Sequence, residues 1–163
     1  AFFLDSPAFR DRVFGPVRQP SCIGCYPADA PGIRRKLRKL FEGPGGPGLP
    51  AADAPKSPHG RLRAALVPHM DFDRGGVTYG WGFKELVEQT DARLFVIVGT
   101  SHYSPHRITL TRQDFSTPLG RVETDAAYVD RLAEVYGPEA FADPYAHLPE
   151  HSIELEVVML QYL

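Results

Sequence analysis

A chain of 163 residues with 43% hydrophobic and 23% charged residues has the composition of one globular domain, residues 1–163. Its formal net charge of −2 argues against a partner held through many phosphate contacts, so nucleic acid is not expected. No apolar stretch is long enough for a membrane span, and the first residues do not form a signal peptide. Only Cys22 and Cys25 are present, too few for the disulfide framework of a small secreted protein, so we expect a cytoplasmic location.

The first predicted element is an amphipathic helix over residues 31–41. Its apolar side chains recur at helical spacing, at Ile33, Leu37, Leu40 and Phe41, and basic residues occupy most other positions. This basic face is more typical of a solvated surface than of a docking site. Residues 43–60 then hold five prolines and five glycines, which predicts a loop within the domain.

After this loop, short apolar runs alternate with amphipathic stretches, a pattern typical of α/β proteins. We predict strands at 63–67, 94–98 and 108–111, and helices at 79–89, 124–137 and 152–163. In the helix at 79–89, we expect Trp81, Phe83, Leu86 and Val87 to be buried. The predicted fold is a central, mostly parallel sheet flanked by helices. The last helix has no C-terminal capping signal, so we expect the domain to continue beyond residue 163.

Two histidines follow predicted strands directly, His69 after 63–67 and His102 after 94–98. If the connection is a right-handed crossover, the strands are parallel and both imidazoles lie at the same edge of the sheet, where α/β proteins bind ligands. Imidazole is the commonest metal ligand, and a catalytic metal needs a third protein ligand. The spacing alone fits a shared metal site and two separately hydrogen-bonded histidines equally well.

Several motifs occur in an order that resembles the Memo family, which includes the B component of the AmmeMemoRadiSam system. They are Val-Arg-Gln-Pro at 17–20 leading to Tyr-Pro at 26–27, Pro-His at 68–69, Gly-Thr-Ser-His at 99–102, Thr-Pro-Leu-Gly at 117–120 followed by Asp125, and Glu-His-Ser-Ile-Glu at 150–154. The resemblance extends over residues 17–163, and a set of ordered motifs is far more specific than one short match.

The resemblance implies a fold like that of the class III extradiol dioxygenases, with a metal held by His69 and His102. Iron or copper is the expected metal, and zinc would also suit the site. His151 matches a histidine beside the metal that serves as acid/base catalyst in the dioxygenases, and imidazole exchanges protons at neutral pH. The family's third ligand, a cysteine in the C-terminal part, has no counterpart here. The expected partners are a small-molecule or peptide ligand and, by resemblance, radical SAM and AMMECR1-like proteins.

Acidic residues near these histidines have two possible roles. Asp71 and Asp73 can accept a hydrogen bond from a ligand histidine and so fix its tautomer, or they can cap the following turn or helix. Glu150 is expected to support the metal ligands in the same way. For His151, the alternative to proton transfer is a helix N-terminal residue bonded to its neighbours.

The function implied by these residues is a metal-dependent oxidoreductase related to the dioxygenases. Two other functions fit the same residues: a peptide- or protein-binding module without catalysis, and a protein that buffers or delivers copper or iron. The Cys22-x-x-Cys25 pattern occurs in redox and zinc sites, but its surroundings match neither, so we expect two buried apolar thiols. His106 follows Pro105 and is expected to be exposed, away from His102.

Overall fold

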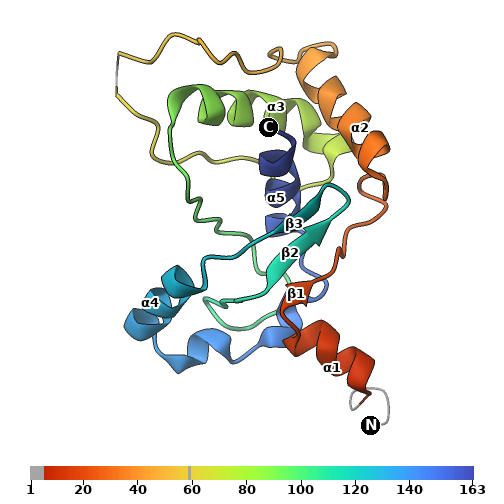
Figure 1. Cartoon of the computed structure of the whole chain (residues 1–163), viewed down its shortest axis with the longest axis vertical. Helices are drawn as coiled ribbons and strands as arrows, with labels where there is room; N and C mark the ends of the chain where they lie inside the picture. Colours follow the sequence, from red (N-terminus) through yellow and green to blue (C-terminus); the bar gives the residue numbers. More distant parts are fainter. Residues whose placement is uncertain (1–5, 59) are drawn as a thin grey trace.

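The computed structural model describes residues 6–58 and 60–163 (Figure 1). In chain order its elements are helix α1 (Pro7–Phe14), strand β1 (Val17–Arg18), helices α2 (Ala30–Glu42) and α3 (Phe72–Gln89), strands β2 (Asp114–Thr117) and β3 (Gly120–Val122), helix α4 (Ala126–Tyr136), the short 3-10 helices η1 (Pro138–Phe141) and η2 (Pro144–His147), and helix α5 (Ser152–Tyr162). The described part of the chain is therefore of the α/β class.

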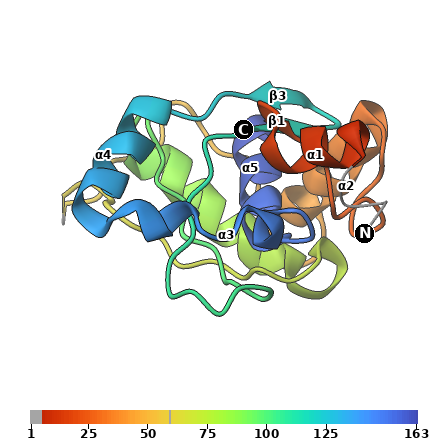
Figure 2. The same cartoon turned by 90° about the horizontal axis from the view of Figure 1, so that it is seen from below.

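The three strands form a small mixed sheet in the order β1-β2-β3. Strand β1 is parallel to β2, with Val17 opposite Asp114, and β2 continues through a tight turn into the antiparallel β3. The turn ends at Gly120, whose φ of 124° is open to glycine at little cost. Helix α5 lies between this sheet and the pair α2 and α3, as the view in Figure 2 shows. The start of α5 is thereby held from both sides.

The strands predicted at 63–67, 94–98 and 108–111 do not form, and this corrects the expected central, mostly parallel sheet. These segments run outside the sheet, and several of their apolar side chains are exposed, with Leu66 at 100% and Val98 at 90%. An apolar, β-branched run favours an extended backbone, but a strand exists only where another strand offers it hydrogen-bonding groups. The apolar run itself does not specify which segment of the chain would be its partner strand.

Most of the predicted helices form, because their signals are local. The predicted helix at 31–41 is α2, which begins after its N-cap Asp29 and fully buries Ile33, Leu37 and Phe41. Helix α3 starts at Phe72, earlier than the predicted residue 79, because the carboxylate of Asp71 accepts hydrogen bonds from the first-turn backbone.

The side chains buried by α3 differ in part from those expected. Phe83 is buried and Leu86 is partly buried against the core, but Trp81 and Val87 are exposed. The Trp81 indole instead donates a hydrogen bond to the carbonyl of Gly45 in the loop. Glycines at the start of α3 allow this helix to approach α2 closely, so that the buried face is rotated toward Phe72 and Tyr79.

One apolar cluster forms the centre of the molecule. It joins α2, α3 and α5 with the segment before α2, and its buried members are Cys22, Tyr26, Ile33, Leu37, Leu40, Phe41, Phe72, Tyr79, Phe83, Leu155, Val158 and Met159. The predicted helices 124–137 and 152–163 are confirmed as α4, between Asp125 and Gly137, and α5. Among the described residues no helix is long and apolar enough to span a membrane.

Candidate metal centre

Three histidines from distant parts of the sequence lie together at one end of α5. The ring centroids of His69 and His102 are 5.2 Å apart, those of His102 and His151 4.9 Å, and those of His69 and His151 6.0 Å. His69 comes from the segment before α3, His102 from the segment after residue 99, and His151 precedes α5. The structure thus brings together the three histidines that the sequence pointed to.

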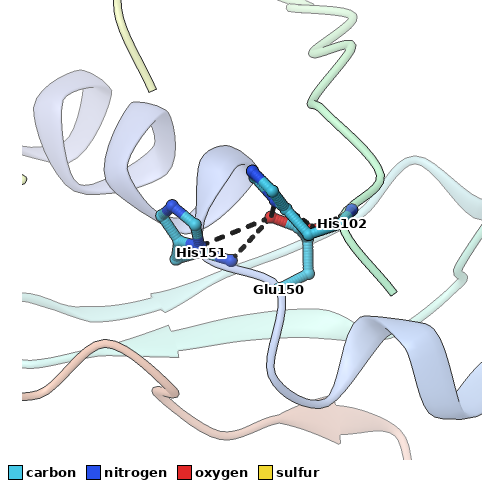
Figure 3. Close-up of side chains that lie close together, drawn as sticks. All are labelled: His102, Glu150 and His151. Atoms are coloured by element: carbon cyan, nitrogen blue, oxygen red, sulfur yellow. Dashed lines mark hydrogen bonds and ion pairs between the residues drawn. The ribbon is translucent and has the colours of Figure 1, made fainter. Parts of the chain in front are cut away.

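The carboxylate of Glu150 joins the site (Figure 3). It accepts hydrogen bonds from the backbone N–H groups of His102 at 3.0 Å, His151 at 2.9 Å and Ser152 at 3.0 Å. The hydroxyl of Ser152 at 3.0 Å and Nδ1 of His102 at 3.1 Å complete the set. An ionised carboxylate can only accept, so Nδ1 of His102 donates to Glu150, and Nε2 is the nitrogen of that ring left to face a metal ion.

The pKa of Glu150 reflects this environment. Burial by itself would raise the pKa, but the hydrogen bonds from the backbone of Ser152 and His102 and from both side chains outweigh burial and lower the pKa from 4.5 to about 2. Glu150 is therefore ionised at neutral pH although it is only 8% exposed. The site keeps one fixed negative charge beside three imidazoles.

This low pKa predicts a loss of stability in acid. The folded-state pKa lies below the ordinary value, so the stabilisation is complete above pH 4.5 and is lost as the pH falls toward 2. We expect the free energy of unfolding to drop by about 3 kcal/mol over this range from Glu150 alone. Denaturant unfolding at several pH values would measure it. Glu150→Gln should remove this part of the pH dependence, and an unchanged slope in that variant would contradict the assignment.

The ring of His151 remains free for a ligand. His151 is the N-cap residue of α5, but its side chain makes no capping hydrogen bond, and its Nδ1 lies 3.6 Å from a Glu150 oxygen. In Figure 3 the rings of His102 and His151 flank this carboxylate, and in both rings the other nitrogen points away from it. His151 thus is a helix N-terminal residue bonded to its neighbour Glu150, as one of the two alternatives has it, and the same position places its ring in the histidine cluster.

A buried ion pair fixes the backbone behind the site. Arg18, which is 2% exposed, donates from Nη1 to Glu154 at 2.7 Å, from Nε to the carbonyl of His147 at 2.8 Å, and from Nη2 to the carbonyl of Glu150. Glu154 is fully buried, and hydrogen bonds from Tyr26, Ser21 and Arg18 outweigh burial and lower its pKa. In the sequence, Arg18 and Glu154 appear only as members of two separate motifs. An ion pair between residues 136 positions apart leaves no local sequence pattern that would predict it.

The other predicted residues have different contacts. Asp71 caps α3, which is the second of the two roles predicted for it, and Asp73 forms an ion pair of 2.7 Å with Lys36. In the described part of the chain neither carboxylate is bonded to a histidine. His106 is exposed, as predicted, and its backbone N–H is bonded to Ser104.

The donor atoms are compatible with a metal ion. One ligand atom each from His102, Glu150 and His151 lies within 4.8 Å of the others, and the His69 ring is adjacent. Imidazole nitrogens suit zinc, copper, iron and nickel, and a carboxylate hydrogen-bonded to a ligand histidine is the usual support for such a ligand. The carboxylate of Glu150 already accepts hydrogen bonds from five donor groups. The group that could hold a metal ion is therefore His102, Glu150 and His151, with His69 beside it.

The cysteines differ from the expected pair of thiols. Cys22 and Cys25 are joined by a disulfide with a Cα–Cα distance of 5.5 Å. Cys22 is buried in the apolar cluster, as predicted, and Cys25 packs against it. The expectation of two free thiols is therefore wrong, and the separation of three residues in the sequence allows the disulfide.

Comparison with known proteins agrees with the motifs. A profile of the family described as "Memo-like protein" matches residues 18–163. The chain belongs to this family. A MEMO1 family protein of Ignicoccus hospitalis is 32% identical over 153 residues, covering 90% of this chain and 52% of the relative. A MEMO1 family protein of Methanothermobacter thermautotrophicus is 31% identical over 150 residues, with the same coverage.

The chain thus spans about half the length of the curated relatives it matches. No solved structure matches it. The family membership confirms the resemblance seen in the motifs, and the five ordered motifs all lie within or at the edge of the matched residues.

Proposed function

We propose that this Memo-like chain binds a transition metal ion, iron or copper in the first place and zinc as a further option, and that the metal centre takes part in redox or oxygen-related chemistry. The observation that supports this is the convergence of His69, His102 and His151 at the N-terminal end of α5, beside a buried and ionised Glu150. Imidazole nitrogens beside a carboxylate that supports one of the rings are a donor set that binds such metals.

In this proposal each residue has a separate task. His69 and His102 hold the metal, and Glu150 fixes the orientation of His102 through Nδ1. His151 either completes the ligand set or exchanges a proton with a bound substrate, as the likeness to the dioxygenases suggests. When bound, the metal would supply Lewis acidity and lower the pKa of a coordinated water. Fold kinship with the class III extradiol dioxygenases is part of this proposal.

Metal analysis tests the proposal directly. Protein purified without oxygen should contain iron, copper or zinc near one equivalent, or take it up from the free ion. The double variant His69→Ala, His102→Ala should lose it, because no two-imidazole set remains. His106→Ala is the matched control, since this histidine is exposed and outside the cluster. Wild-type protein that binds none of the three metals would refute the metal centre.

A cavity beside the site supports a small-molecule or peptide ligand. It has a volume of about 520 Å³ and is lined by His69, by apolar residues of segments 62–67 and 94–99, and by Ser152, Glu156 and Leu160 along α5. Pockets of this size and apolar character are typical of ligand sites. A binding module without turnover remains the second candidate, in which ligand binding survives His102→Ala.

The remaining expectations also belong to the proposal. Radical SAM and AMMECR1-like proteins are the proposed partners. If the protein instead delivers copper or iron, it should exchange the metal rapidly without turning over a substrate. A cytoplasmic location would place the Cys22–Cys25 pair in a reducing compartment, where disulfides are rarely permanent.

A further inference from the structure

The disulfide closes a tight turn between β1 and α2. The backbone N–H of Cys25 donates to the carbonyl of Cys22 at 2.9 Å, and Ile23 and Tyr26 form an isolated bridge. Gly24 lies between them with a φ of 116°, in the left-handed region that favours glycine. The turn is therefore a small, defined unit whose conformation depends on the bond between the two sulfur atoms.

Both sides of this turn are bonded to one carboxylate of α5. Glu154, which is fully buried, accepts hydrogen bonds from the backbone N–H of Ser21 at 2.8 Å and of Cys22 at 3.0 Å. The Tyr26 hydroxyl donates to the same carboxylate. A change in the turn must therefore change the position or the bonding of a buried charge.

The same network continues to the metal centre. The Ser21 hydroxyl donates to Glu154 at 2.9 Å and lies 3.1 Å from the backbone carbonyl of Glu150. The Arg18 guanidinium links the same two residues, the Glu154 carboxylate and the Glu150 carbonyl. The Glu150 side chain holds His102. Hydrogen bonds therefore lead from the turn to Glu150, through Ser21 or through Glu154 and Arg18, and from Glu150 to a proposed metal ligand.

We propose that the Cys22–Cys25 disulfide is a reversible redox site that reacts with dithiols, and that its reduction weakens metal binding by the histidine cluster. The second part rests on the proposed function. The sulfur open to attack is that of Cys25, which is half-buried, whereas Cys22 is 7% exposed within the core. The exposed neighbours Ile23 and Gly24 leave room for a reductant at this position.

The exchange is balanced with a dithiol as the two-electron reductant. One thiolate attacks Sγ of Cys25, the S–S bond breaks, and Cys22 leaves as a thiolate that takes up a proton. The second thiol of the reductant then attacks the mixed disulfide, so that Cys25 is released as a thiol. The reductant becomes a cyclic disulfide, and the protein holds two thiols.

Reduction affects the metal centre because the S–S bond no longer holds the turn closed. Without the S–S bond the turn gains conformational freedom, and the amides of Ser21 and Cys22 are no longer held against Glu154. The Glu150 carbonyl then loses part of the support that orients its carboxylate. Changes in groups that support a metal ligand typically weaken binding by tenfold or more, so we expect about tenfold weaker affinity in the reduced state.

The first measurement concerns the thiols alone and does not involve metal. Native protein treated with dithiothreitol should release two titratable thiols, which disappear again on oxidation with a disulfide reagent. No thiol release from the folded protein would overturn the redox site, whatever the metal results are.

The second measurement compares metal affinities by competition with a chromophoric chelator. Oxidised wild type is compared with the double variant Cys22→Ser, Cys25→Ser, which has the open turn but no thiolate to bind metal, after circular dichroism has shown that both are folded. Equal affinities for Co²⁺ and Zn²⁺ would overturn the coupling. Absence of binding in both proteins would refute the proposed function and the coupling together, while the thiol titration would still decide the redox site.

Two controls complete the test. Wild type that has been reduced and freed of reductant should have the same metal affinity as the serine variant. If the serine variant does not fold, the reduced wild type takes its place in the comparison. If the reduced double variant His69→Ala, His102→Ala still binds metal, the thiolates are ligands themselves and the coupling is overturned. A separate measurement on metal-free protein tests whether the turn affects His102 through Glu150. The ¹⁵N shifts of the His102 ring should differ between the oxidised and serine forms, and identical shifts would contradict this connection.

Discussion

Arg18→Met should lower the free energy of unfolding by about 3–5 kcal/mol, because it leaves a buried carboxylate without its partner. Glu154 is fully buried, and Nη1 of Arg18 is 2.7 Å from its oxygen. The carbonyls of His147 and Glu150 would lose hydrogen bonds as well. Denaturant unfolding at pH 7, with the midpoint and the slope both measured, gives this quantity.

Two variants decide whether the ion pair is the reason. Arg38→Met breaks the exposed pair with Glu42 and should leave the unfolding midpoint almost unchanged. Adding Glu154→Leu to Arg18→Met should recover only part of the lost stability. It removes the unpaired charge, but the amides of Ser21 and Cys22 and the Tyr26 hydroxyl lose their acceptor. A small effect of Arg18→Met alone would mean that Glu154 becomes protonated or hydrated at little cost.

Glu150→Gln should weaken metal binding roughly 10- to 100-fold, the usual effect of altering a group that orients a ligand histidine. A glutamine has one acceptor oxygen and an NH₂ group that donates, whereas the carboxylate accepts from five donors at this position. Nδ1 of His102 would lose its charged acceptor, and the neighbouring backbone N–H groups would compete for the remaining oxygen. Competition with a chromophoric chelator measures the affinity.

Glu134→Gln is the matched control, because Glu134 is exposed on α4, a helix that contributes no residue to the histidine cluster. It should leave both affinity and stability unchanged. An affinity loss much larger than 100-fold in Glu150→Gln would instead identify Glu150 as a metal ligand, and an unchanged affinity would remove it from the site.

The helices could be predicted from the sequence because their signals lie within a few residues. The apolar spacing of α2 and the Asp125 and Gly137 boundaries of α4 are local features, and both helices form where expected. The start of α3 was missed because its capping residue Asp71 precedes glycines, which are poor helix formers. Here the cap and the packing against α2 outweigh the local preference.

The strands could not be predicted in the same way. The runs at 63–67 and 94–98 have the composition of buried strands, but they do not pair, whereas the two residues of β1 pair with Asp114 and Phe115 almost one hundred positions away. Pairing depends on which backbone groups meet in the folded chain, and a short segment holds no information about that.

The sequence by itself determined the family, through five ordered motifs, and the identity of the three histidines. It also determined the helices whose apolar spacing and caps are local. Only the tertiary structure decided which groups support these histidines. In the folded chain Glu150 is hydrogen-bonded to His102, whereas Asp71 caps α3 and Asp73 pairs with Lys36. The disulfide turn is hydrogen-bonded to α5 through Glu154. The reason is physical: hydrogen bonds of buried charges connect residues more than one hundred positions apart, and their geometry exists only once the core has packed.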